Sequence, residues 1–90
     1  MTYRFELERR AHKALGRLPK RDRARVVAAI DALAENPRPS GCVPIRAAPN
    51  GTYRMRVGGF RVIYVVLDDE ELIIVARVAR RSETAYRKPG

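Results

Sequence analysis

The chain has 90 residues, 46% of them hydrophobic, and a formal net charge of +9. This length predicts one domain spanning residues 1–90, because single-core domains typically contain about 100–150 residues. The longest apolar run, residues 62–67, is far shorter than the ~18 residues of a membrane span, and residues 1–4 show no signal-peptide core. Cys42 is the only cysteine, which excludes an intramolecular disulfide. We therefore expect a cytoplasmic protein without a membrane partner.

Arginine supplies most of the positive charge, at sixteen of the nineteen basic residues. Four of the ten acidic residues fall together at positions 68–71, so the arginines elsewhere in the second half have few local partners. A guanidinium group donates paired hydrogen bonds that match phosphate oxygens. A charged surface can serve solubility alone, but solubility requires neither arginine in place of lysine nor clustering. The composition favours a polyanionic partner, most simply a nucleic acid.

The first half of the chain predicts a strand and two helices. Tyr3, Phe5 and Leu7 alternate with polar residues, which is the period of a half-buried strand. Apolar residues then recur with helical spacing over 7–18 and over 26–34, on either side of a turn at Pro19. Asn36-Pro37 ends the second helix, because proline cannot continue it. Residues 36–51 contain four prolines and two glycines, and we expect a connection without regular structure there.

The second half predicts an antiparallel meander. Strands are expected over residues 53–57, 60–67 and 72–79, with Gly58-Gly59 as a two-residue hairpin turn and the acidic cluster as the second turn. Residues 82–90 are polar, and we expect them to be irregular or a short helix. The predicted fold class is therefore α+β: an N-terminal strand, a two-helix hairpin, then a three-stranded antiparallel meander, with both helices on one face of the sheet.

The hairpin turn fixes a register, and the register gathers arginines. If Gly58 and Gly59 form the turn, Arg56 lies directly opposite Arg61, and Arg54 shares their face. The alternate residues face the helices as a core. Two arginines opposite each other on neighbouring strands repel, so stability alone would not favour them. We infer that an anion binds between them.

The third strand adds to this face in a way that the sequence leaves open. Pairing residue 67 with residue 72 would place Arg61 opposite Val78. Simple alternation then puts Arg80 rather than Arg81 on the arginine face, whereas a bulge or the strand end would reverse the order. The same register gives the face an apolar strip, typical of an interaction surface; its members are Ile63, Val65, Leu67, Leu72, Ile74, Ala76 and Val78.

The sequence contains no motif for the other common kinds of catalytic site. It contains no phosphate-binding loop, no metal-ligand spacing and no nucleophile–base motif. His12 lies on the side of its helix opposite the leucines and is interpreted as a surface residue. Cys42, in the proline-rich connection, is interpreted as an inert thiol. We expect no cofactor, and neither metal-dependent hydrolysis nor a serine–histidine–aspartate mechanism.

Over nearly its whole length the chain resembles the RelE/ParE toxin superfamily. The matching features are Glu-Asn-Pro-Arg-Pro at residues 35–39, Tyr-Arg-Met-Arg-Val-Gly-Gly-Phe-Arg-Val-Ile-Tyr at residues 53–64, Arg80-Arg81, and Tyr86-Arg87. RelE-like members are toxins of bacterial toxin–antitoxin pairs that cut mRNA in the ribosomal A site. ParE-like members share the fold, poison DNA gyrase and generally lack the full basic set with the tail tyrosine.

By position, the resemblance implies a RelE-type catalytic group at Arg54, Arg56, Arg61, Arg81 and Tyr86. The complete set favours a ribosome-dependent, metal-independent endoribonuclease in which the 2′-hydroxyl of the message attacks. The alternatives are a gyrase poison that acts by binding and a plain nucleic-acid-binding module. The best-known RelE has lysines where this chain has Arg54 and Arg56, which bears on the proton chemistry.

The resemblance also implies partners. It predicts mRNA on the ribosome and a cognate acidic, RelB-like antitoxin, with operator DNA bound only through that antitoxin. Within the implied site, we expect Arg61 and Arg56 to stabilise the charge of the reacting phosphate and Arg54 to position the backbone. Arg81 would neutralise or protonate the leaving oxygen. Tyr86 would act as the base or stack on an RNA base.

Overall fold

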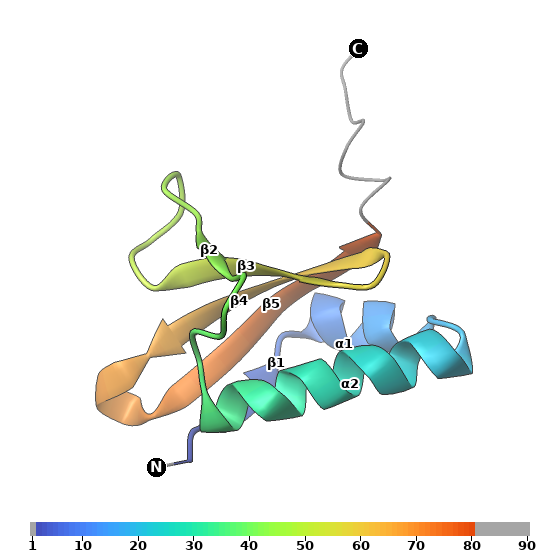
Figure 1. Ribbon diagram of the computed structural model, residues 1–90, viewed down its shortest axis with the longest axis horizontal. Coiled ribbons are helices and arrows are strands. Elements are labelled where there is room, and N and C mark those ends of the chain that lie inside the picture. The colour runs from blue at the N-terminus through green and yellow to red at the C-terminus, as the bar shows by residue number, and fades with distance from the viewer. Residues whose placement is uncertain (1, 81–90) are drawn as a thin grey trace.

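The computed structural model describes residues 2–80 and has two layers, one of helices and one of sheet (Figure 1). In chain order the elements are β1 (Arg4–Leu7), α1 (Arg9–Gly16), α2 (Lys20–Glu35), β2 (Val43–Pro44), β3 (Thr52–Val57), β4 (Phe60–Leu67), the short 3-10 helix η1 (Asp68–Glu70) and β5 (Leu72–Arg80). Both helices lie on the same side of the sheet, which confirms the predicted α+β class.

The sheet has five strands in the order β1-β5-β4-β3-β2. Strand β1 pairs in parallel with β5, and the other neighbours are antiparallel. The prediction of no regular structure in residues 36–51 was wrong at one point, because β2 pairs Val43 with Arg54 and Pro44 with Tyr53. Two residues are too few to show an alternating pattern, and an edge strand tolerates proline because one side of it needs no hydrogen bonds.

The core lies between α2 and the helix-facing side of the sheet. Helix α2 buries Val26, Ile30 and Leu33, which recur every three or four residues and so form one stripe. Strands β3 and β4 bury alternate residues against this stripe: Met55, Val57, Phe60, Val62, Tyr64 and Val66. Burying one such apolar side chain contributes roughly 1.5–3 kcal/mol relative to leaving it exposed. The predicted helix-facing side of the hairpin is thus confirmed.

The first helix is shorter than the apolar spacing predicted. Leu7, the first member of that stripe, belongs to β1, and α1 starts at Arg9 after the extended residue Glu8. The amide of Glu8 donates to the carbonyl of Val75 at 2.9 Å, so β1 continues its pairing with β5 up to the helix. A strand and a helix meet here without a loop. Tyr3 and Leu7 consequently pack on the same core as α1.

A β-bulge changes the register between β4 and β5. Leu67 pairs with Leu72 as predicted, but the register shifts between Tyr64, which pairs with Val75, and Ile63, which pairs with Arg77. The prediction that Arg61 pairs with Val78 was therefore wrong, because its partner is Ala79. One extra residue in β5 reverses the faces of everything that follows it.

Two residues exchange faces as a result. Val78 is 5% exposed and belongs to the core, so it is not part of the apolar strip that the sequence predicted. Arg77 is exposed and lies opposite Ile63, on the side of the sheet away from the helices.

Among the helices within residues 2–80, none has the length and apolar character that crossing a membrane requires.

Candidate functional site

Four arginines of β3, β4 and β5 lie on the side of the sheet away from the helices, which we call the outer face. Arg56 of β3 pairs with Arg61 of β4, as the hairpin turn predicted. In the next row Arg54 pairs with Ile63, and Ile63 pairs on its other side with Arg77. Arg56 and Arg77 are exposed, whereas Arg54 and Arg61 are half-buried. The structure thus brings together three of the five predicted site residues and adds a fourth arginine.

The hairpin that carries Arg56 and Arg61 is contacted by a side chain of the helix layer. Gly58 has φ +59°, a left-handed conformation that glycine adopts at little cost. A Cβ at this position would lie 2.8 Å from Nη1 of Arg25, so the guanidinium of this α2 residue contacts the turn. The turn is therefore fixed both by its glycine and by a side chain from the other layer. Arg56 and Arg61 are carried on this supported turn.

The outer face keeps its positive charge. Within residues 2–80, no side-chain hydrogen bond or ion pair joins Arg54, Arg56 or Arg77 to another described residue. Glu6 points to the same face but lies on the edge strand, paired with Ile74. Opposite residues on neighbouring antiparallel strands have Cβ atoms ~4.5–5.5 Å apart, so like charges there destabilise the sheet. An anion bound between Arg56 and Arg61 would remove that repulsion.

Arg80 lies on the helix side of the sheet rather than on the outer face. It pairs with Phe60, and its Cζ is 5.2 Å from the centroid of the Phe60 ring. Next to it, a groove is lined by Ala14, Arg17, Leu18, Phe60, Val78, Ala79 and Arg80. Arg80 is therefore not on the outer face, where simple alternation had placed it. Arg81 and Tyr86 lie outside the described residues.

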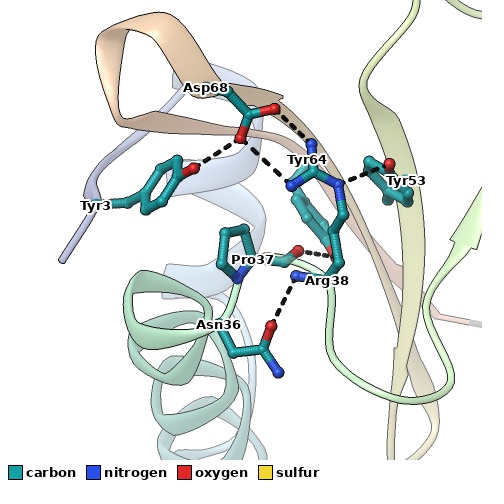
Figure 2. Close-up of polar contacts among 7 residues, drawn as sticks. All are labelled: Tyr3, Asn36, Pro37, Arg38, Tyr53, Tyr64 and Asp68. Atoms are coloured by element: carbon teal, nitrogen blue, oxygen red, sulfur yellow. Dashed lines mark hydrogen bonds and ion pairs between the residues drawn. The ribbon is translucent and has the colours of Figure 1, made fainter. Parts of the chain in front are cut away.

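The far end of the sheet holds the ion pair that the described residues form. Figure 2 shows Nη2 of Arg38 donating to Oδ2 of Asp68 at 2.7 Å and Nε of Arg38 donating to the Tyr53 hydroxyl at 2.9 Å. The hydroxyl of Tyr3 donates to Oδ1 of Asp68 at 2.6 Å. Hydrogen bonds from Arg38 and Tyr3 hold the pKa of Asp68 below its ordinary value, and the bond to Asp68 raises the pKa of Tyr3.

This network explains why residues 35–39 belong to the motif. Arg38 follows the end of α2 and reaches β3 and the β4–β5 turn, while the hydroxyl of Tyr64 donates to the carbonyl of Pro37 at 2.9 Å. Burial raises the pKa of Tyr64, and its ring stacks on that of Tyr53 with centroids 5.8 Å apart. These residues tie the connection to the sheet. The segment from Arg61 to Leu67 spans about 20 Å at strand spacing, so the acidic turn stands well away from the arginines.

Apolar residues cover the part of the outer face between the two ends. Ile63, Val65 and Leu67 are half-buried there, as are Ile74 and Ala76 of β5. Leu72, which the sequence also assigned to this strip, is 7% exposed. Val43 of the short edge strand extends the strip beside Arg54 and is 42% exposed. The outer face thus combines cations with apolar surface.

Sequence reasoning missed Arg77, although the sequence carries a signal for it. In the alternation that begins with Ile73 and Val75, the next position holds the charged Arg77, and the next apolar residue is Val78, a step of three instead of two. Such a step is what one extra residue in a strand produces. Arg38 was missed because its partners are remote in sequence.

In the part of the chain that the structure describes, no group of three or more His, Cys, Asp or Glu residues could hold a metal ion.

Comparison with known proteins identifies the class of protein to which this fold belongs. The family model for the ParE toxin of type II toxin–antitoxin system, parDE, matches residues 5–85, so the chain belongs to this family of the RelE/ParE toxin superfamily. A Methanocaldococcus jannaschii protein that carries the name toxin RelE1 is 36% identical over 91 residues, covering 99% of this chain and 100% of the relative.

Solved structures of RelE toxins share the fold. The RelE–RelB complex of Pyrococcus horikoshii OT3 contains a chain that matches with a TM-score of 0.79 and 31% identity, covering 90% of this chain and 97% of that one. The toxin–antitoxin complex RelBE2 of Mycobacterium tuberculosis matches with a TM-score of 0.75 and 27% identity, covering 90% and 100%. The individual relatives thus place the chain with the toxins of RelBE-type systems.

Proposed function

We propose that this chain is a ribosome-dependent mRNA endoribonuclease of the RelE type and that the outer face holds the message. The observation that carries the proposal is the Arg56–Arg61 cross-strand pair, with Arg54 on the same face. Paired guanidinium groups suit a phosphate that gains charge during a reaction. The RelE names of its relatives support the same activity.

The chemistry that these residues suit is attack by the message on itself. The 2′-hydroxyl loses its proton and its oxygen bonds to the adjacent phosphorus. The bond from phosphorus to the 5′-oxygen then breaks, and that oxygen takes up a proton, leaving a 2′,3′-cyclic phosphate and a 5′-hydroxyl. Arg61 and Arg56 stabilise the extra negative charge at phosphorus, and Arg54 positions the backbone. Fixed donors aimed at developing charge are often the largest catalytic contribution.

The proton transfers fall to residues beyond the described part of the chain and to the ribosome. An arginine keeps its proton throughout the neutral pH range and makes a poor general base. Tyr86, assigned by the resemblance, would accept the proton or stack on an unpaired base. Arg81 neutralises the leaving oxygen. His12, on α1, belongs to the opposite layer. The ribosome supplies the remaining geometry.

An acidic, RelB-like antitoxin is the proposed regulatory partner. The relatives of known structure were solved as RelE–RelB and RelBE2 complexes. On this chain the outer face offers Arg54, Arg56 and Arg77, whose side chains have no carboxylate partner among residues 2–80. Beside them lie the apolar residues Val43, Ile63 and Val65. An acidic segment with apolar side chains would fit both. Operator DNA would be bound only through the antitoxin, and the toxin would act in the cytoplasm.

A second candidate is a gyrase poison, favoured by one observation: the matching family model is that of the ParE toxin. The two functions are separated by expressing the chain under an inducible promoter, mapping mRNA ends, and assaying gyrase-cleaved DNA in the same cells. We expect new mRNA ends within coding frames and growth arrest. Intact mRNA with accumulated gyrase-cleaved DNA would reject the ribonuclease and favour the ParE-type function.

A further inference from the structure

The bulge in β5 gives the outer face a second row of arginines. The first row runs Arg56, Arg61, Ala79 across β3, β4 and β5, and the second runs Arg54, Ile63, Arg77 across the same strands. The second row therefore has a cation at each end and an apolar residue between them. Without the bulge, Val78 would face outward and Arg77 would face the helices.

Strand geometry sets the spacing of these groups. Neighbouring strands lie about 4.8 Å apart, so the backbones at Arg54 and Arg77 are separated by roughly 10 Å across Ile63. Arg77 and Arg61 are diagonal neighbours, at about 7–8 Å between their backbones. When Arg56 and Arg61 bind one phosphate of the message, Arg77 can therefore reach a different phosphate of the same RNA molecule.

The simpler interpretation of Arg77 is a solvated surface residue, and for a lone outward arginine that is the usual one. Three observations oppose it here. Arg77 forms no ion pair within the described residues. It adds positive charge to a face on which Arg56 and Arg61 lie directly opposite each other. It also lies on β5 in a row with Arg54, where its backbone is paired with Ile63 of β4.

We propose that Arg77, with Arg54 across Ile63, binds the phosphate next to the scissile phosphate and so fixes the register of the message on the sheet. The proposal rests on the proposed ribonuclease function and deepens it, since it assigns a subsite of the same face. Arg77 is a binding residue rather than a catalytic one. Its loss should weaken productive binding of the message more than it slows the chemical step.

The test compares the wild type with Arg77→Gln on ribosomes programmed with a short message in the A site. We expect the toxin concentration for half-maximal cleavage to rise about tenfold or more, because a charge-assisted contact is lost, while the saturated rate changes less. Arg77→Lys should recover part of the loss. Arg21→Gln, which removes the same charge from the exposed first turn of α2, is the matched control and should behave as the wild type.

A chemical change in the message identifies the phosphate. One message carries an uncharged methylphosphonate on the 5′ side of the scissile phosphate, and another carries it on the 3′ side. One of these two changes should weaken cleavage by the wild type strongly. It should weaken cleavage by Arg77→Gln far less, because that variant already lacks the guanidinium that binds the altered phosphate. Equal losses for both proteins with both messages would overturn the assignment, even if Arg77→Gln is impaired.

The outcomes separate this inference from the function on which it rests. If the wild type does not cut the unmodified message, the ribonuclease function is wrong and the Arg77 subsite falls with it. If the wild type cuts and Arg77→Gln cuts equally well at every toxin concentration, the subsite alone is wrong. Thermal unfolding of the variants should match the wild type, because the exposed Arg77 side chain forms no hydrogen bond or ion pair with another described residue.

Discussion

Arg56 of β3 lies directly opposite Arg61 of β4. Both are two residues from the glycine turn that the guanidinium of Arg25 contacts. A repelling pair is thus placed at a well-supported point of the sheet. Sites built on paired strands are held more precisely than sites on loops, and precise placement is what stabilising a short-lived charge requires. The fold provides rigid positions for the cations, at a cost in stability that a bound anion would offset.

The first prediction concerns this pair. Arg61→Ala and Arg56→Ala should each lower the cleavage rate on the ribosome, with Arg61→Ala reducing it about 10²–10³-fold, because a donor to the developing charge is lost. Growth arrest on expression should disappear for Arg61→Ala. The rates are measured at saturating toxin, with Arg21→Ala as a control for net charge. Cleavage by Arg61→Ala at the wild-type rate would remove this residue from the site.

The second prediction concerns the nucleophile. A message with a 2′-deoxy nucleotide at the scissile position should resist cleavage, because the attacking oxygen is missing. The unmodified message should give a 5′ fragment that ends in a 2′,3′-cyclic phosphate. Mass spectrometry of the fragments distinguishes this end from a simple phosphate. Normal cutting of the deoxy message would show that a water molecule attacks instead.

The third prediction concerns Tyr86, which lies outside the described residues and is assigned by resemblance alone. Tyr86→Phe should slow cleavage strongly and leave ribosome binding nearly unchanged, because the ring is kept and the ionisable hydroxyl is lost. Single-turnover rates and ribosome affinity are measured side by side. A Tyr86→Phe protein as fast as the wild type would exclude the base and leave stacking as its role.

The hairpin was predictable because every step was local. Two glycines fix a two-residue turn, and the turn fixes which residues face each other, so the placement of Arg56 opposite Arg61 followed from the sequence. The sequence left a bulge in the third strand open as one alternative but did not locate it, because pairing from the acidic turn assumed an unbroken ladder up to Val78. Strand β2 and the Arg38–Asp68 contact were missed for a related reason: their partners lie nine or more residues away, and no local pattern encodes them.

The fourth prediction concerns pH and the network at the far end of the sheet. The pKa of Asp68 is lowered in the folded chain by its bonds with Arg38 and Tyr3, so this carboxylate contributes stability above its unfolded pKa, near ~3.9. The contribution is lost as the pH falls through the lowered folded value. Asp68→Asn should therefore be less stable than the wild type at neutral pH, and the difference should disappear in acid.

Urea unfolding between pH 2 and pH 7 measures this difference. Asp69→Asn is the matched control, because Asp69 is a neighbouring exposed carboxylate with no side-chain hydrogen bond among residues 2–80. It should keep the pH dependence of the wild type. An Asp68→Asn protein that follows the wild type at every pH would show that the Arg38–Asp68 contact contributes nothing to stability, as exposed ion pairs often do.

The last prediction concerns the antitoxin. Co-expression with an adjacent reading frame that encodes a short acidic protein should restore growth, and the two proteins should purify together. Affinity should fall as salt is added, because charge pairs on the exposed part of the face are screened, and should then reach a floor set by apolar burial. Arg56→Ala should flatten the salt dependence, whereas Val43→Ser should lower the floor, because Val43 is an exposed apolar residue of the same face. If the neighbour neither rescues growth nor binds the toxin, it is not the partner of the outer face. If it binds but neither variant alters its affinity, binding takes place elsewhere on the chain.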